Sequence, residues 1–174
     1  MAKSSKHYRL SLRILFVIGL MIIASGLITI GTEQQPSISS PVFEQRLLPV
    51  KIELPSGKHI NLVRTELSDG TWYVDNTLGN YLSESAGLGT GGNVVIYGHN
   101  YPHIFGSLDE VRTGELVLVT DQNQVEHHYQ IELITEVNPS DTSWIQPTTQ
   151  SLLTLYTCSG FLDSKRLIVR AIAI

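Results

Sequence analysis

The segment Ser151–Ala171 reads SLLTLYTCSGFLDSKRLIVRA and contains the only cysteine of the chain, Cys158, at the end of an apolar run. Arg166 opens a second apolar run, Leu167–Val169, after a short connection. Two such runs predict a hairpin of buried strands. A thiol and a guanidinium brought together by a hairpin suggest a nucleophile and a group that stabilises charge. The alternative is that Cys158 is a small buried hydrophobic residue, as free cysteines usually are.

The composition suits one domain of ordinary size with an appendage, because the chain has 174 residues of which 42% are hydrophobic. The charges are unevenly distributed. Four of the 12 Lys and Arg residues lie before position 14, which leaves eight basic against 16 acidic residues in the remainder. An acidic domain is a poor ligand for phosphate groups, so we expect no nucleic-acid partner.

An uncharged segment of 17 residues, Ile14–Ile30, lies close to the N-terminus. Its length predicts a transmembrane signal-anchor, and the basic residues 1–13 before it predict a cytoplasmic N-terminus. A cleaved signal peptide is the alternative, but the apolar run continues beyond the small residues Ala24–Gly26. We therefore expect a single-pass protein of the cell membrane, with a linker over 31–46 and an outward-facing domain over 47–174.

The outward-facing domain shows short apolar or alternating runs separated by turn residues, and little helical periodicity. This pattern predicts an all-β barrel or sandwich. Residues 76–92 and 138–150 are expected to form long loops, the first with one short helical turn, and residues 108–112 a further helical turn. The expected strands are Leu48–Leu54, Ile60–Thr65, Thr71–Val74, Asn93–Tyr97, Glu115–Thr120, Val125–Val137, Leu152–Thr157 and Arg166–Ile174.

His99 is the best candidate for a base beside the thiol, because it follows the fully apolar run Asn93–Tyr97 and the flexible residue Gly98. A histidine there would lie at the end of a strand, as Cys158 and Arg166 do. The remaining histidines lie before the apolar segment, in turns, or on an adjacent pair of strand positions that face opposite ways. His103 is four residues from His99, but no CxxC motif or carboxylate cluster completes a metal site, so none is predicted.

Three motifs, taken together, resemble the sortases, the membrane-anchored cysteine transpeptidases of bacterial cell surfaces. TLYTC at Thr154–Cys158 matches the family motif TLxTC. VIYGHN at Val95–Asn100 is similar to the strand that ends in the family's catalytic histidine, and KRLIVRA at Lys165–Ala171 to the strand that opens with its catalytic arginine. The spacing after His99 is most similar to that of class D and E sortases, although Asn100 stands where many of them have arginine.

The resemblance implies a closed eight-stranded β-barrel with short helical turns, and a catalytic triad of His99, Cys158 and Arg166. It implies cleavage of an LPxTG-like sorting signal through a thioacyl intermediate on Cys158. The acyl group would pass to an amine on a cell-wall precursor or a pilin lysine. No cofactor is expected. Thr157 and Trp144 are candidates for contact with the substrate.

Two other functions remain open at this level. A thiol hydrolase or protease would use the same three residues and transfer the acyl group to water. A non-catalytic anchored β-domain would bind a wall component and would leave Cys158 unreactive. A product assay with an added amine distinguishes a hydrolase from a transpeptidase. Replacement of Cys158 distinguishes a binding domain from either enzyme, because only the enzymes would lose their function.

Overall fold

The computed structural model describes residues 46–68 and 71–174. The predicted cytoplasmic segment, the membrane anchor and all but the last residue of the linker lie outside the described residues. Among the residues that are described, no helix combines the length and apolar character that crossing a membrane requires.

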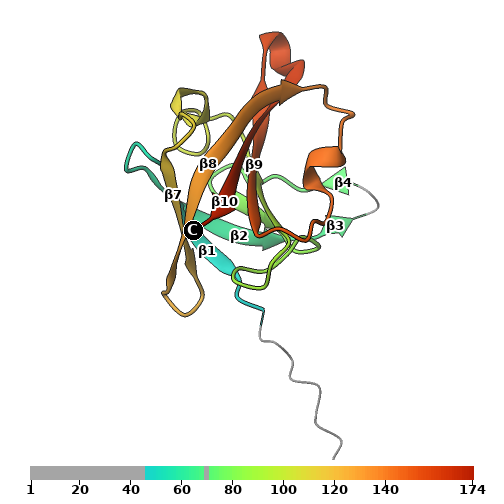
Figure 1. The fold of residues 1–174 in the computed structure, drawn as a ribbon. Helices are drawn as coiled ribbons and strands as arrows, with labels where there is room; N and C mark the ends of the chain where they lie inside the picture. The colour runs from blue at the N-terminus through green and yellow to red at the C-terminus, as the bar shows by residue number, and fades with distance from the viewer. Residues whose placement is uncertain (1–45, 69–70) are drawn as a thin grey trace, which may run out of the picture. The chain divides into compact units, whose positions relative to one another are not determined.

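The described chain forms a closed barrel of eight strands in the order β1-β2-β5-β6-β9-β10-β8-β7 (Figure 1). Pairing of β1 with β7 closes the barrel. The all-β fold and the eight-stranded closure agree with the expectation from the sequence. The barrel strands are β1 (Pro49–Glu53), β2 (His59–Thr65), β5 (Gly79–Leu82), β6 (Asn93–Gly98), β7 (Leu116–Asp121), β8 (Glu126–Val137), β9 (Leu152–Ser159) and β10 (Lys165–Ala173).

Short 3-10 helices interrupt three of the connections. They are η1 (Leu108–Glu110), η2 (Ser143–Ile145) and η3 (Phe161–Asp163). The helical turn predicted over 108–112 is therefore confirmed, at η1. The two long loops behave differently, since 138–150 carries only η2 whereas 76–92 contains a barrel strand.

That strand is the main error of the sequence-based prediction. Residues 76–92 were expected to be a loop with a helical turn, but they include β5, whose four residues are all buried. β5 pairs in parallel with β2, and a Cβ at Gly79 would lie 2.6 Å from Leu62 Cδ2. A strand of four residues that begins with a closely packed glycine shows no alternation of apolar and polar residues, so its sequence does not indicate a strand.

The predicted strand Thr71–Val74 is also corrected. Only Thr71–Trp72 is extended, as β4, and it pairs with β3 (Leu67–Ser68) in a separate two-stranded sheet. This small sheet does not belong to the barrel. It brings Trp72 and Val74 against the outer surface of the barrel, as the packing below shows.

Apolar side chains cover both faces of the barrel wall near β6 and β9. The interior core includes Ile96 from β6 and Leu155 from β9, both 0% exposed. A second cluster lies on the other face, where Val95 and Tyr97 pack with Leu82. The partly buried residues that cover this outer cluster are Trp72, Val74, Ile145 and Tyr156. A strand covered on both faces reads as a continuous apolar run, which explains the sequence of β6.

Candidate active site

Cys158 and Arg166 lie directly opposite one another. β9 and β10 pair in antiparallel register, and Arg166 is the partner of Cys158. Side chains of directly opposed residues point to the same face of a sheet, with Cβ atoms about 5 Å apart. The hairpin predicted from the sequence therefore brings the thiol and the guanidinium to one face.

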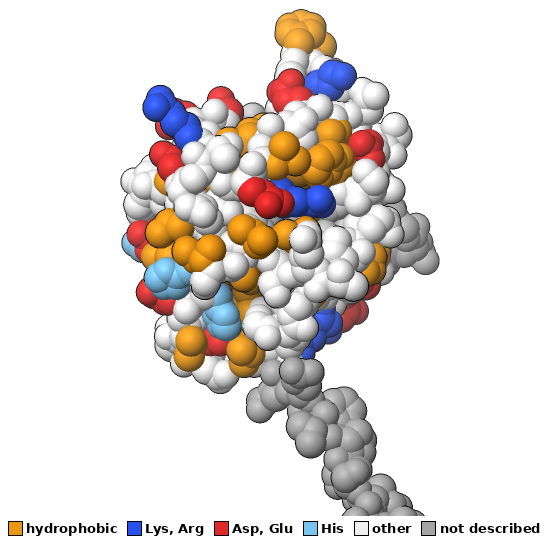
Figure 2. All heavy atoms as spheres, in the orientation of Figure 1, with side chains coloured by type: hydrophobic (Ala, Val, Ile, Leu, Met, Phe, Trp, Pro, Cys, Tyr) orange, Lys and Arg blue, Asp and Glu red, His pale blue; other side chains and the backbone are white. Residues whose placement is uncertain are grey.

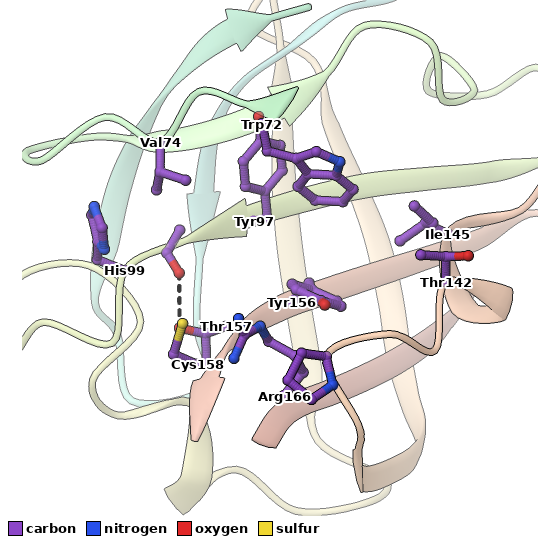
Figure 3. A pocket seen from close by; sticks show the side chains of 12 residues that line it. Trp72, Val74, Tyr97, His99, Thr142, Ile145, Tyr156, Thr157, Cys158 and Arg166 are labelled. Carbon is purple, nitrogen blue, oxygen red and sulfur yellow. Dashed lines mark hydrogen bonds between the residues drawn. The ribbon is translucent and has the colours of Figure 1, made fainter. Parts of the chain in front are cut away.

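His99 reaches the same place because β6 and β9 run in parallel. Gly98, the last residue of β6, is the register partner of Thr157, so His99 and Cys158 are the residues that follow this pair. Thr157 Oγ1 donates a hydrogen bond of 2.8 Å to the Gly98 carbonyl, drawn as the dashed line in Figure 3. A side-chain hydrogen bond thus ties together the ends of the two strands that carry the candidate nucleophile and base.

Gly98 is required for close packing rather than for a turn. Its φ is not positive, unlike that of six other glycines in the described chain. A Cβ at this position would lie 2.9 Å from Ile104 Cγ2 and 3.1 Å from Phe105 Cδ2. Both neighbours are fully buried. Gly98 thus serves tight contact between the end of β6 and the following loop, and its flexibility is not used for a positive φ.

The loop after β6 places an aromatic ring against the imidazole of His99. The His99 ring stacks on Tyr101, with centroids 4.6 Å apart and planes at 15°. Tyr101 in turn lies 5.7 Å from the ring of His103. His103 Nε2 lies 3.0 Å from the backbone oxygen of Asn76, so the row of rings is anchored to the loop before β5.

All three predicted catalytic residues line one pocket of about 280 Å³ (Figure 3). Its apolar part is formed by the outer cluster, and its polar end by the three candidate residues. In Figure 3, His99 lies at one end, Cys158 and Arg166 follow, and Ile145 with Thr142 lies at the other end. The full lining is Trp72, Val74, Tyr97, Gly98, His99, Pro139, Thr142, Ile145, Tyr156, Thr157, Cys158 and Arg166.

The local environment favours the neutral thiol. Burial raises the pKa of Cys158, while the positive charge of Arg166 acts to lower it and Asp163 acts to raise it. Arg166 is itself held in place, because its Nη1 donates to the carbonyls of Asp163 and Lys165, both at 2.8 Å. Among the described residues, no group of three or more His, Cys, Asp or Glu side chains could hold a metal ion. The pocket itself brings together a thiol, an imidazole and a guanidinium.

The model of the sortase domain matches residues 52–173, which is most of the chain and all of this site. The chain belongs to the sortase family. Sortases are cysteine transpeptidases, so this assignment places the protein among enzymes of that class. No curated protein matches the chain.

Solved sortase structures share the fold of this sortase. A lid mutant of sortase A from Corynebacterium diphtheriae is 27% identical, with a TM-score of 0.62 over 77% of this chain and 74% of that one. Sortase A from the same organism is 26% identical, with a TM-score of 0.63 over 75% of this chain and 62% of that one. Sortase C1 from Streptococcus agalactiae is 26% identical, with a TM-score of 0.60 over 71% and 66%.

This sortase thus spans less than two thirds of the length of two of those three relatives. The relatives are named as sortases of types A and C1. The similarity to classes D and E, drawn from the spacing after His99, stays a prediction.

The tip of the β9–β10 hairpin in this sortase is short, protruding and apolar. Phe161 and Leu162 are 84% and 83% exposed, and hydrophobic side chains cap the hairpin that rises above the barrel (Figures 1 and 2). Gly160, Leu162 and Asp163 all have positive φ, at 74°, 52° and 58°. This tight turn leaves only seven residues between Cys158 and Arg166, which keeps both side chains at the pocket.

Trp144 and Thr157, the two residues predicted to contact substrate, both have structural partners. Thr157 lines the pocket, and contact of either residue with substrate stays a prediction. Trp144 is absent from the pocket lining, and the Arg170 guanidinium lies 4.7 Å from the centroid of its ring. The Trp144 carbonyl accepts hydrogen bonds from Arg170 Nη2 at 3.0 Å and Asn93 Nδ2 at 2.9 Å. Trp144 thereby fixes the loop that carries η2. The Thr157 hydroxyl is buried and donates to Gly98, so it is not available to an oxyanion.

Sequence reasoning missed the apolar part of the pocket. Trp72, Tyr97 and Tyr156 line it, and the rings of Trp72 and Tyr97 lie 4.5 Å apart between centroids. One signal was present, because the uninterrupted apolar run of β6 indicates a strand covered on both faces. The residues that cover the outer face could not be predicted, since Trp72 and Ile145 come from segments far apart in the sequence.

Proposed function

We propose that this sortase cleaves an LPxTG-like sorting signal and forms a thioacyl intermediate on Cys158. The acyl group then passes to an amine on a cell-wall precursor or a pilin. The observation that carries the proposal is the convergence of His99, Cys158 and Arg166 on one pocket through the β6–β9 and β9–β10 pairings. We base the proposed substrate, the acceptor and the roles of the three residues on this geometry and on the membership of the sortase family.

The first half of the reaction breaks one peptide bond. The Cys158 thiolate attacks the carbonyl carbon of the threonine of the signal, and a tetrahedral intermediate forms. The C–N bond then breaks, and His99 in its imidazolium form protonates the leaving amine. The products are a thioester on Cys158 and a free amino terminus on the released fragment. In the second half an incoming amine gives a proton to His99 and attacks the thioester, which restores the thiolate and the imidazolium.

Arg166 is the group proposed to stabilise the oxyanion. Both of its hydrogen bonds to backbone carbonyls use Nη1, so the donors on Nη2 and Nε are not committed to these carbonyls. A guanidinium carries five N–H donors, which is enough to hold its own loop and a substrate carbonyl at once. The bonds to Asp163 and Lys165 fix the group before substrate arrives.

We also propose that the enzyme is anchored in the cell membrane by residues 14–30, with the N-terminus cytoplasmic and the barrel outside. The support is the uncharged run of 17 residues and the basic residues before it. A protein held outside the cytoplasm meets secreted polypeptides and wall precursors. This location suits the proposed substrates.

The test uses the full-length protein, LPxTG peptides with the third position randomised, and hydroxylamine as the amine. Mass spectrometry is expected to show a thioester on Cys158 and a hydroxamate product. Both should disappear in Cys158→Ala, and the thioester should be depleted in His99→Ala. Arg166→Lys should lower the yield of both products, and Arg112→Lys, at an exposed position outside the pocket, is the matched control. Transpeptidation that persists in Cys158→Ala would refute the mechanism.

The same experiment separates the alternatives. A hydrolase gives the free carboxylate at the same rate with and without hydroxylamine, whereas a transpeptidase gives the hydroxamate. A non-catalytic binding domain gives neither product, and its Cys158 resists a thiol-reactive probe.

A further inference from the structure

A second pocket, of about 630 Å³, lies next to the first and has no part in the chemistry above. Ile145, at the end of η2, lines both pockets. Leu82 in the second pocket also belongs to the outer apolar cluster that floors the first. The two pockets therefore adjoin at Ile145, and each includes residues of β6.

The chemistry defines which half of a substrate runs toward this second pocket. His99 protonates the leaving amine, so the leaving fragment and the incoming acceptor lie on the His99 side of Cys158. Figure 3 shows Ile145 at the opposite end of the pocket from His99. The acyl half of the donor, which stays bound to Cys158, must therefore extend toward Ile145. Residues on its N-terminal side continue past Ile145.

The length of β6 between the two pockets shows how many substrate residues are needed to reach the second one. The second pocket contains Asn93, the first residue of β6, whereas the first pocket contains Gly98, its last residue. Five steps of about 3.3 Å separate these residues, or about 17 Å. An extended peptide with its scissile carbonyl at Cys158 covers the same distance in about five residues. The acyl side of an LPxTG signal supplies four, so the residues just before the motif reach the second pocket.

The lining of the second pocket combines an apolar wall with one basic and one acidic side chain, Arg46 and Glu84. Leu82, Ile145 and Pro147 form an apolar wall. Glu84 is the acidic residue of the lining, and its carboxylate already accepts hydrogen bonds from the Leu67 N–H at 3.0 Å and from Ser83 Oγ at 3.2 Å. The side chain of Asn93 is likewise occupied, since its Nδ2 donates to Trp144 and Gln146 and its Oδ1 accepts from Thr154.

We propose that this pocket is a substrate subsite that binds the two or three residues immediately upstream of the sorting signal, with an apolar side chain against Leu82 and Pro147. The inference rests on the proposed function, because the direction of the substrate follows from the role of His99. It makes the enzyme selective for sorting signals in a particular sequence context, beyond the motif itself. The amine acceptor does not use this site, since it enters on the His99 side.

The test compares three LPxTG peptides with the full-length protein. One starts at the leucine of the motif and is acetylated, one carries Gly-Gly-Gly before it, and one carries Gly-Val-Leu. We expect the KM for the Gly-Val-Leu peptide to be about tenfold below that of the other two, which corresponds to one buried aliphatic side chain. We expect kcat to be the same for all three.

Two variants locate the effect. Thr90 is exposed and lines the second pocket only, so Thr90→Trp should fill it and remove the advantage of the Gly-Val-Leu peptide. Pro147→Asp should do the same by placing a charge on the apolar wall. In both variants the acetylated short peptide should keep its kcat and KM, which shows that the barrel and the first pocket are intact. Thr113→Trp, at an exposed position outside both pockets, is the matched control.

The outcomes are distinct. Equal KM values for the three peptides in the unaltered protein would overturn the subsite and leave the proposed function standing. A lower KM for the Gly-Val-Leu peptide that persists in both Thr90→Trp and Pro147→Asp would also overturn the subsite. Cleavage of none of the peptides would overturn the proposed function, and the subsite with it.

Discussion

At the scale of single residues, the reactivity of Cys158 depends on two opposing effects. Burial raises the pKa of the thiol, and the nearby Arg166 guanidinium acts to lower it. Because the thiolate is the nucleophile, burial alone would leave little reactive enzyme at neutral pH. Arg166 therefore has an electrostatic role before any substrate is bound, besides its proposed role toward the oxyanion.

Replacing Arg166 is expected to make Cys158 less acidic. In the unaltered protein the rate of alkylation by iodoacetamide should rise with pH and reach its midpoint above the usual pKa of a thiol. In Arg166→Gln the lowering effect is lost, so the pKa rises further and the curve moves to higher pH. Arg112→Gln, an exposed change elsewhere, should leave the curve in place. A curve for Arg166→Gln that is unmoved or moved to lower pH would contradict this account.

Tyr101 is expected to position the imidazole of His99 through ring stacking. Such aromatic contacts are worth about 0.5–1.5 kcal/mol, so Tyr101→Ala should lower kcat/KM by about threefold to tenfold and alter its pH profile. Tyr101→Phe keeps the ring and should behave like the unaltered protein. The measurement is kcat/KM against pH for all three proteins. If Tyr101→Phe and Tyr101→Ala lost kcat/KM equally, the effect would belong to the hydroxyl group and not to the ring stacking.

At the scale of elements, the parallel pairing of β6 and β9 is what joins the candidate base to the candidate nucleophile. Parallel neighbours run in one direction, so residues that follow both strands come out at the same end of the sheet. The register Gly98–Thr157 places His99 and Cys158 at equivalent positions. The Thr157 hydroxyl reinforces this pairing where the ladder ends.

Thr157→Val is expected to weaken this junction without changing the size of the side chain. The substitution leaves the Gly98 carbonyl without its hydroxyl donor, and a lost hydrogen bond at a buried site costs about 1–3 kcal/mol. Urea unfolding at pH 7 measures the loss. Thr113→Val, at an exposed position, is the control and should unfold like the unaltered protein. A Thr157→Val midpoint that matches the control would show that the hydrogen bond carries no net stability.

At the scale of the whole molecule, the barrel depends on the seam where β1 meets β7. Asp121 ends β7 at this seam, is fully buried, and is the register partner of Pro49. Its carboxylate accepts the N–H groups of Asn123 at 2.8 Å and Val125 at 3.0 Å, and lies 3.0 Å from His127 Nε2. Burial acts to raise the pKa of Asp121, but the hydrogen bonds from His127 and the two backbone groups outweigh it, so the pKa is lowered.

Asp121→Asn is therefore expected to destabilise the barrel in a pH-dependent way. A carboxyl whose pKa is lower in the folded protein stabilises the fold above its unfolded pKa of about 4, and this stability is lost as the pH falls through the folded value. At pH 7 the variant should lose about 1–3 kcal/mol, the range for a hydrogen bond to a charged group. Urea midpoints at pH 7 and pH 3 test the sign, because the difference should shrink at pH 3.

Asp109→Asn removes an exposed carboxylate and serves as the control for this comparison. A difference between Asp121→Asn and the unaltered protein that is as large at pH 3 as at pH 7 would mean that the charge of Asp121 is not what stabilises the turn between β7 and β8.

Local patterns were enough to predict most of this barrel. Strong apolar runs such as Leu152–Thr157 and Asn93–Tyr97 became β9 and β6 within two residues of their predicted ends. The Cys158–Arg166 pairing was also readable, because a hairpin with a short turn brings together residues that are close in sequence. The position of His99 at a strand end followed from the apolar run before it, while the catalytic roles of all three residues stay predictions.

Contacts between distant segments were decided only by the tertiary structure. β5 is four residues long and pairs in parallel with β2, so neither its length nor its neighbours in sequence indicate a strand. Trp72 and Ile145 reach the pocket from separate segments of the chain. Trp144 packs against Arg170 and does not line the pocket. The sequence shows which side chains are apolar, but the tertiary structure determines which of them are in contact. For that reason the candidate catalytic residues could be chosen from the sequence, whereas the lining of the pockets beside them could not.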